Sequence, residues 1–273
     1  MTPSWKYQNY RSIFTAAYIV YMKQIFRTLI LFSLTIFSPA VFAQNKMQSL
    51  EELINNTDPA WPLVQKWIGS AKNKVEVLAP DSAKAKDALY NMQVSTYSTL
   101  GSIIYNTGGI MVDNGWLRIL GSGSTRLKRN VPEWNKGKTI QEYGDKPGYL
   151  LVADDAAGGF FAINYGALGS DLKNIYYLAP NSLNWEPLNA GYGEFILFCF
   201  DSDLSAFYKG LRWASWDQFI ANLDGSKSYS FRPYLWSEEG KDIDKCTRKL
   251  VPTDDLYKFN IVKQKELKAA VKE

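Results

Sequence analysis

Two adjacent carboxylates, Asp154 and Asp155, are the first side chains of the sequence whose chemistry could serve a function. They follow one apolar run and precede Gly158-Gly159 and a second apolar run, which predicts the tip of a β-hairpin. Carboxylates on such a turn could hold calcium, a cation that takes oxygen ligands. Asp201 and Asp203 form a similar pair. Because aspartate also shapes turns through its own backbone, the sequence leaves both a cation site and a plain turn open.

A second candidate lies in residues 211–216, where Arg212 and Trp213 precede Trp216. Two tryptophans three positions apart can share one face of a helix, and an arginine can stack on their rings. Such a surface would suit a sugar or a protein partner. The same spacing is also typical of side chains that pack into a core.

Catalytic and metal-binding motifs are otherwise excluded or weak. The sequence contains no histidine, which removes Ser-His-Asp and Cys-His catalysis and the usual zinc ligands. The glycine-rich residues 121–125 lack the lysine and spacing of a phosphate-binding loop, so we interpret them as a turn. Residues 170–173 match Ser-x-x-Lys without its companion motifs. We therefore predict no catalytic residue, no metal site and no cofactor.

The first 43 residues have the parts of a secretory signal. Lys23 and Arg27 precede an uncharged apolar run over residues 29–37, and Ala43 stands before the polar Gln44. That run is shorter than the roughly 20 residues that a membrane-spanning helix needs. We predict a signal peptide cleaved before Gln44, a natural start at Met22, and a periplasmic or secreted product. The alternative is an uncleaved membrane anchor.

The chain after the proposed leader is balanced in charge and contains two cysteines. Four of the 31 basic residues precede Gln44, which leaves 27 basic and 27 acidic residues after it. A nucleic-acid-binding protein normally has a marked basic excess, so we predict no nucleic-acid partner. Export would permit a disulfide between Cys199 and Cys246. Cys199 lies in an apolar run, however, where a buried free thiol is equally ordinary.

Hydrophobic periodicity predicts an α+β domain. Helices are expected over residues 61–69, opened by Asp58-Pro59, and over 82–92, with a short strand at 75–78 between them. Three consecutive hairpins then predict an antiparallel meander: 110–112 with 116–120, 149–152 with 160–163, and 175–178 with the segment around residue 185. Helices follow from 192 to 223, then a strand at 229–231. We expect one domain over residues 44–262 and a fraying charged tail over 263–273.

Several of these segments resemble a known family. Gly108 to Ile110, Asn114 to Gly123, Asp154 to Gly159, Phe207 to Trp213 and Tyr234 to Trp236 resemble blocks of the DUF2625 family of bacterial proteins, and the match covers residues 47–262. The resemblance implies the fold and no catalytic residue, because the family has no established activity. The acidic, glycine-containing hairpin is also similar to SUKH (SMI1/KNR4-like) domains, many of which bind and neutralise toxins.

Together these features favour an exported, non-enzymatic protein that binds a protein partner. Aromatic residues make up 15% of the sequence, and tryptophan and tyrosine are common in partner surfaces. The alternative is a carbohydrate or cell-envelope polymer binder, which could also act as a carboxylate-dependent hydrolase. Asp154, Asp155, Arg212, Trp213 and Trp216 are the candidate binding residues for either function.

Overall fold

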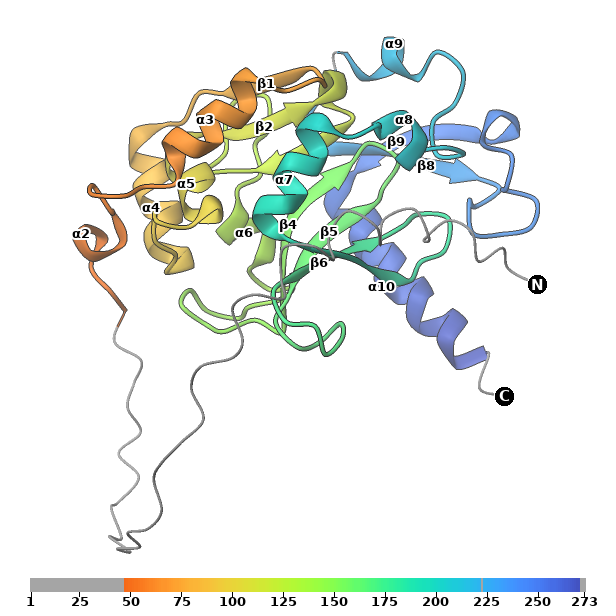
Figure 1. The fold of residues 1–273 in the computed structure, drawn as a ribbon. Helices are drawn as coiled ribbons and strands as arrows, with labels where there is room; N and C mark the ends of the chain where they lie inside the picture. Colours follow the sequence, from red (N-terminus) through yellow and green to blue (C-terminus); the bar gives the residue numbers. More distant parts are fainter. Residues whose placement is uncertain (1–46, 222, 271–273) are drawn as a thin grey trace, which may run out of the picture. The chain divides into compact units, whose positions relative to one another are not determined.

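The computed structural model describes residues 47–221 and 223–270, and the proposed leader lies outside these residues. Its centre is a seven-stranded antiparallel sheet whose strands follow one another in chain order (Figure 1). The strands are β1 (Val75–Leu78), β2 (Gly109–Val112), β3 (Leu117–Leu120), β4 (Tyr149–Asp155), β5 (Phe160–Asn164), β6 (Asn174–Leu178) and β7 (Trp185–Gly191). Helices lie before and after the sheet in the chain, so the predicted α+β meander is confirmed.

The predicted hairpins form because their connections tolerate the required backbone angles. Between β2 and β3 the chain makes a 3₁₀ turn, η2 (Asp113–Gly115), in which Asn114 and Gly115 have φ angles of 60° and 90°. Glycine and asparagine adopt such positive angles at low cost. The pairs β4–β5 and β6–β7 also form as predicted.

Helices cover both faces of the sheet. Phe160 and Phe161 are neighbours on β5, so their side chains point to opposite faces. Phe160 contacts Trp134 and Tyr257, which belong to helices α6 (Val131–Asn135) and α10 (Thr253–Ala270). Phe161 contacts Phe195 of helix α7 (Tyr192–Asp201). Burial on two faces explains why the central strands are continuous apolar runs rather than alternating ones.

The N-terminal helices are α2 (Leu50–Leu53), α3 (Trp61–Gly69), α4 (Ser82–Met92) and α5 (Thr99–Asn106). Asp81 caps α4, because its carboxylate accepts the backbone N–H groups of Ala83 and Lys84. The predicted opening of α3 at Asp58-Pro59 was wrong by two residues: Ala60 is the N-cap and Pro62 occupies the first turn. A proline at that position lacks only an N–H that the helix would leave unpaired.

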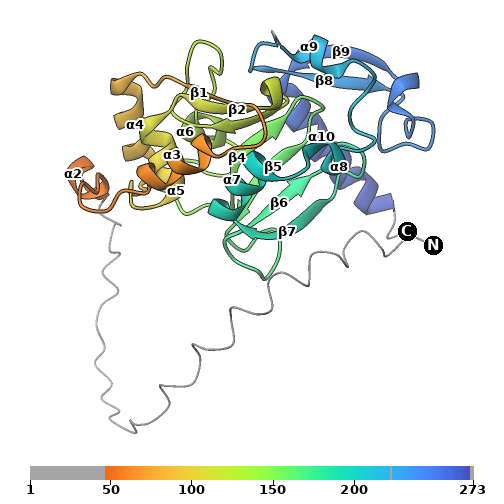
Figure 2. The same cartoon turned by 45° about the horizontal axis from the view of Figure 1, so that its top comes forward.

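The C-terminal third differs most from the sequence-based prediction. Short helices α8 (Leu204–Phe207) and α9 (Trp216–Ile220) follow α7, and a separate two-stranded sheet pairs β8 (Lys227–Arg232) with β9 (Thr247–Pro252) after the turn η3 (Ile243–Lys245). Figure 2 shows β8, β9 and α9 grouped at one end of the sheet. The expected fraying tail is instead helical to Ala270, and Gln264 in it is buried.

Candidate functional site

Asp154 lies inside a buried ion-pair network on one face of the sheet. Strand pairing sets Asp154 directly opposite Arg118 of β3, and Asp154 forms ion pairs with both Arg118 and Arg129. The side chains of Arg118 and Asp154 are completely buried. Arg118 also donates to the carbonyl of Lys227, at 2.5 Å, which joins β3 to β8. The network therefore ties the two sheets together.

Asp155 points to the opposite face and fixes the hairpin turn. Its Oδ1 accepts the backbone N–H groups of Ala157 and Gly159, each at 2.9 Å, and its Oδ2 accepts the Tyr177 hydroxyl at 2.7 Å. Burial raises the pKa of Asp155, and the hydrogen bonds from Tyr177 and Gly159 oppose that rise. Both side chains are therefore buried and point apart, so the two carboxylates do not face one cation, as the calcium alternative would require.

Arg212 is enclosed by aromatic rings. Its guanidinium carbon lies 4.0 Å from the ring centre of Trp216, 4.9 Å from that of Trp116 and 5.0 Å from that of Tyr208. It also forms an ion pair with Asp113, 2.6 Å between Nη2 and Oδ2. Favourable cation–π contacts of this kind hold a charge in a desolvated place. The structure therefore places Arg212 on Trp216, as the sequence suggested.

Trp213 and Trp216 do not share a helical face. Trp213 precedes α9, and Ser215 between them has a φ angle of 58°, which interrupts any helix. Trp213 is 2% exposed and packs on Trp116, Tyr229 and Phe231. It belongs to the core, as the alternative interpretation had it.

An exposed apolar and cationic surface lies over Trp213, and we call Trp216, Phe219, Arg248 and Leu250 the Phe219 surface. Phe219 is 51% exposed and Leu250 is 41% exposed. The Arg248 guanidinium stands 5.0 Å from the Trp213 ring centre and 5.8 Å from that of Phe219. Strand pairing places Leu250 opposite Tyr229 and Arg248 opposite Phe231. The floor is thus rigid and the outer side chains are accessible.

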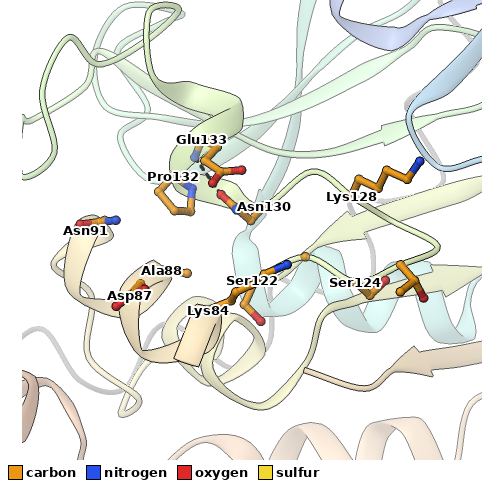
Figure 3. A pocket seen from close by; sticks show the side chains of 12 residues that line it. Lys84, Asp87, Ala88, Asn91, Ser122, Ser124, Lys128, Asn130, Pro132 and Glu133 are labelled. Carbon is orange, nitrogen blue, oxygen red and sulfur yellow. Dashed lines mark hydrogen bonds between the residues drawn. The ribbon is translucent and has the colours of Figure 1, made fainter. Parts of the chain in front are cut away.

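A polar hollow of about 300 Å³ lies between α4, residues 122–128 and the start of α6. Its walls carry side chains of both charge signs together with amides and hydroxyls, and Figure 3 shows those of α4 across from those of α6. The lining side chains of α4 are Lys84, Asp87, Ala88 and Asn91. These residues were missed from the sequence, although their spacing of three and four marks one helical face.

Cys199 and Cys246 are both buried free thiols in the structure, so the disulfide considered from the sequence does not form there. Burial raises the pKa of each thiol. Raised pKa values keep thiols protonated and unreactive. Neither cysteine is therefore a candidate nucleophile.

Two absences hold for the described residues. Among residues 47–221 and 223–270, no group of three or more cysteine, aspartate or glutamate side chains is arranged to hold a metal ion. None of the helices in this part of the chain combines the length and apolar character needed to cross a membrane.

Comparison with known proteins places the fold in a family. The family described as "Protein of unknown function DUF2625" matches residues 50–256. An uncharacterized protein of Haemophilus influenzae is 41% identical over 224 residues, which cover 82% of this chain and 98% of that protein. The putative uncharacterized protein YbfG of Escherichia coli is 39% identical over 215 residues, which cover 78% of this chain and 95% of that protein. No solved structure matches. The likeness to SUKH domains stays a prediction, whereas the resemblance to the first family is confirmed: this chain belongs to the DUF2625 family.

Proposed function

We infer that this chain is an exported, non-enzymatic module that binds a protein partner through the Phe219 surface. The observation that carries the proposal is the exposure of Phe219 and Leu250 around Arg248 on a fixed aromatic floor. Aromatic residues and arginine are enriched where proteins bind one another, and rigid anchors lose little entropy on binding. A partner that fits would offer an apolar recess with an acidic group for Arg248.

The candidate carboxylates support a non-enzymatic role. Glycoside hydrolysis needs two carboxyl groups that face each other across the substrate. Asp154 and Asp155 instead point to opposite faces of the sheet and are completely buried. Both carboxylates are engaged by ion pairs or hydrogen bonds from neighbouring segments, as a structural role requires.

Site-specific crosslinking tests the partner surface. A photoreactive phenylalanine analogue is introduced at Phe219 in the full-length chain in its native host. Tyr97, which is 64% exposed and precedes α5, receives the same analogue as the matched control. We expect one discrete protein adduct at position 219 that is absent at position 97 and lost when Arg248→Ala is added. The same adducts at both positions, or none at position 219, would contradict the proposal.

The export step has a separate test. The charge-free apolar run at 29–37 and the small residue at 43 support a periplasmic or secreted location. Sequencing the N-terminus of the protein recovered from cell fractions should give Gln44 in the periplasmic or external fraction. An uncleaved chain in the cytosol would remove this part of the proposal and leave the Phe219 surface to be judged by crosslinking.

A glycan or envelope polymer is the second candidate ligand, and an aromatic stack favours it. The ring centres of Tyr234 and Trp236 are 4.1 Å apart, and their ring planes are inclined at 14°. The ring centre of Phe259 lies 5.4 Å from that of Tyr234. All three side chains are half-buried, so part of the stack is accessible for packing against a sugar ring. Retention on insoluble cell-wall polymer that is lost in Trp236→Ala and kept in Phe219→Ala would favour this candidate over the first.

A further inference from the structure

The hollow beside α4 has a floor and a rim of different character. Ala88, Ser122, Gly123, Asn130 and Pro132 are buried and form a small, uncharged floor. The exposed rim carries charges, namely Lys84 and Asp87 from α4, Lys128 from the loop and Glu133 from α6. Two positive and two negative side chains make the rim neutral in sum.

The rim side chains are available to a ligand. Within residues 47–221 and 223–270, the side chains of Lys84, Asp87 and Glu133 form no ion pair or hydrogen bond, and the side chains of Asp81 and Asn130 engage only the backbone N–H groups of Lys84 and Glu133. Lys128 has one long contact, 3.7 Å from its Nζ to Asp224 Oδ2. Unengaged groups of opposite sign that line one hollow can accept and donate hydrogen bonds together, which a single-sign site cannot.

The glycine-rich loop excludes a phosphate as the occupant. Phosphate-binding loops work by aiming several free backbone N–H groups at the anion. Here the N–H groups of Ser122, Gly123 and Ser124 donate to the carbonyls of Thr107, Gly108 and Leu127, at 3.0, 3.0 and 2.8 Å. The rim, which is neutral in sum, also offers an anion no net attraction. The loop instead lies tightly against β2, where a Cβ on Gly121 would come 2.6 Å from the Gly109 nitrogen.

We propose that this hollow binds a small, neutral, hydroxyl-rich molecule such as a monosaccharide, independently of the Phe219 surface. Each sugar hydroxyl donates one hydrogen bond and accepts others. Such a molecule can therefore donate to Asp87 and Glu133 and accept from Lys84 and the Asn91 amide. A volume of about 300 Å³ lies at the small end of ligand pockets and suits a single ring rather than a polymer.

Titration of the full-length mature protein tests this site, with amide chemical shifts as the readout. The probes are glucose, N-acetylglucosamine and inorganic phosphate. We expect saturable shifts from at least one of the two sugars, centred on residues 84–91 and 122–133. Phosphate should give none there. No saturable shift from either sugar, or a stronger response to phosphate, would overturn the proposal.

A pair of lysines on one helix gives the matched control. Lys84 lines the hollow, whereas Lys86, two positions away on α4, does not. Lys84→Ala and Asp87→Ala should each weaken sugar binding on the order of threefold to tenfold, the worth of one lost hydrogen bond. Lys86→Ala should leave it unchanged. Equal losses in Lys84→Ala and Lys86→Ala, or binding abolished only by Trp236→Ala, would place the sugar elsewhere.

Discussion

Arg118 places a guanidinium within a strand of otherwise apolar side chains. A buried ion pair adds little net stability, because both charges have lost their water, but removing one partner leaves the other uncompensated. Arg118→Met would leave Asp154 with Arg129 alone and would also remove the hydrogen bonds to Lys227 and Ser228. We expect the free energy of unfolding in urea to fall by about 3 to 5 kcal/mol.

Arg126 is the control for that substitution. It forms an exposed ion pair with Glu76, and exposed pairs contribute about 0 to 1 kcal/mol. Arg126→Met should therefore change the free energy of unfolding by no more than that amount. If both variants lost equal stability, Arg118 would not have the role that its burial implies.

Tyr176 and Asp171 form a hydrogen bond whose effect depends on pH. The Tyr176 hydroxyl lowers the pKa of Asp171, and the same bond raises the pKa of Tyr176 to about 12. A lowered carboxyl pKa contributes stability that is present above the ordinary value of 3.8 and is lost as the pH falls through the lowered pKa. Tyr176→Phe should thus destabilise the protein at neutral pH and by less in acid.

Urea unfolding from about pH 7 to about pH 2 would measure this difference. Tyr97→Phe, which removes a hydroxyl from a side chain that is 64% exposed, serves as the control and should follow the wild-type curve. A constant difference between Tyr176→Phe and wild type across the acid range would show that the hydroxyl does not act through Asp171.

Single residues also mark the limit of inference from sequence. The stacking of Arg212 on Trp216 could be predicted from their proximity in the chain. The spacing also allowed Trp213 to pack into the core, but its partners Tyr229 and Phe231 could not be predicted, because β8 lies after α9 in the sequence. Arg118 offered a signal that was overlooked: a charge within an apolar strand requires a buried partner. Its partner, Asp154, was instead interpreted from the sequence as part of a turn or a cation site.

At the scale of elements, local signals were sufficient for the meander. In each hairpin the turn residues lie directly between two apolar runs, so the strands could be predicted from sequence. Strand β9 was missed because Thr247, Arg248, Lys249 and Pro252 have no strand pattern of their own. It forms by pairing with β8. Strand β8 in turn is hydrogen-bonded to the β4–β5 turn, because the Tyr229 N–H donates to the Ala156 carbonyl at 2.8 Å.

The β4–β5 turn depends on Gly159, because only a residue without a side chain leaves room for Asp155 and Tyr177. A Cβ on Gly159 would lie 2.2 Å from Asp155 Oδ2 and 2.4 Å from the Tyr177 hydroxyl oxygen. Gly159→Ala must therefore separate the hydrogen-bonded pair, and overpacking of this kind costs about 1 to 3 kcal/mol. We expect that loss in urea unfolding, together with faster hydrogen exchange at the amides of Ala157 and residue 159.

Gly69 provides the comparison, because a Cβ there would meet no atom within 4 Å. It is the last residue of α3, where alanine is the better helix former. Gly69→Ala should leave stability unchanged or raise it slightly. A similar loss in both variants would indicate that the crowding at the turn is not the cause.

At the scale of the whole described chain, α10 connects segments that are distant in sequence. Tyr257 shares a hydrogen bond of 2.8 Å with Tyr149, and Asn260 donates to the Gly158 carbonyl at 3.1 Å. Gln264 donates to the carbonyl of Leu183 at 2.6 Å. Composition alone predicted a fraying tail from residue 263. These tertiary contacts override it, because a helix is stabilised mainly by what its buried face contacts.

Gln264 provides the test of this docking. Gln264→Ala removes the donor to Leu183 O, which has no other hydrogen-bond donor among the described residues, whereas Lys265→Ala changes an exposed neighbour on the same helix. We expect Gln264→Ala to lower the free energy of unfolding by about 1 kcal/mol and to speed hydrogen exchange over residues 263–270. Lys265→Ala should do neither. Fast exchange over 263–270 already in the wild type would contradict a docked helix and restore the fraying tail.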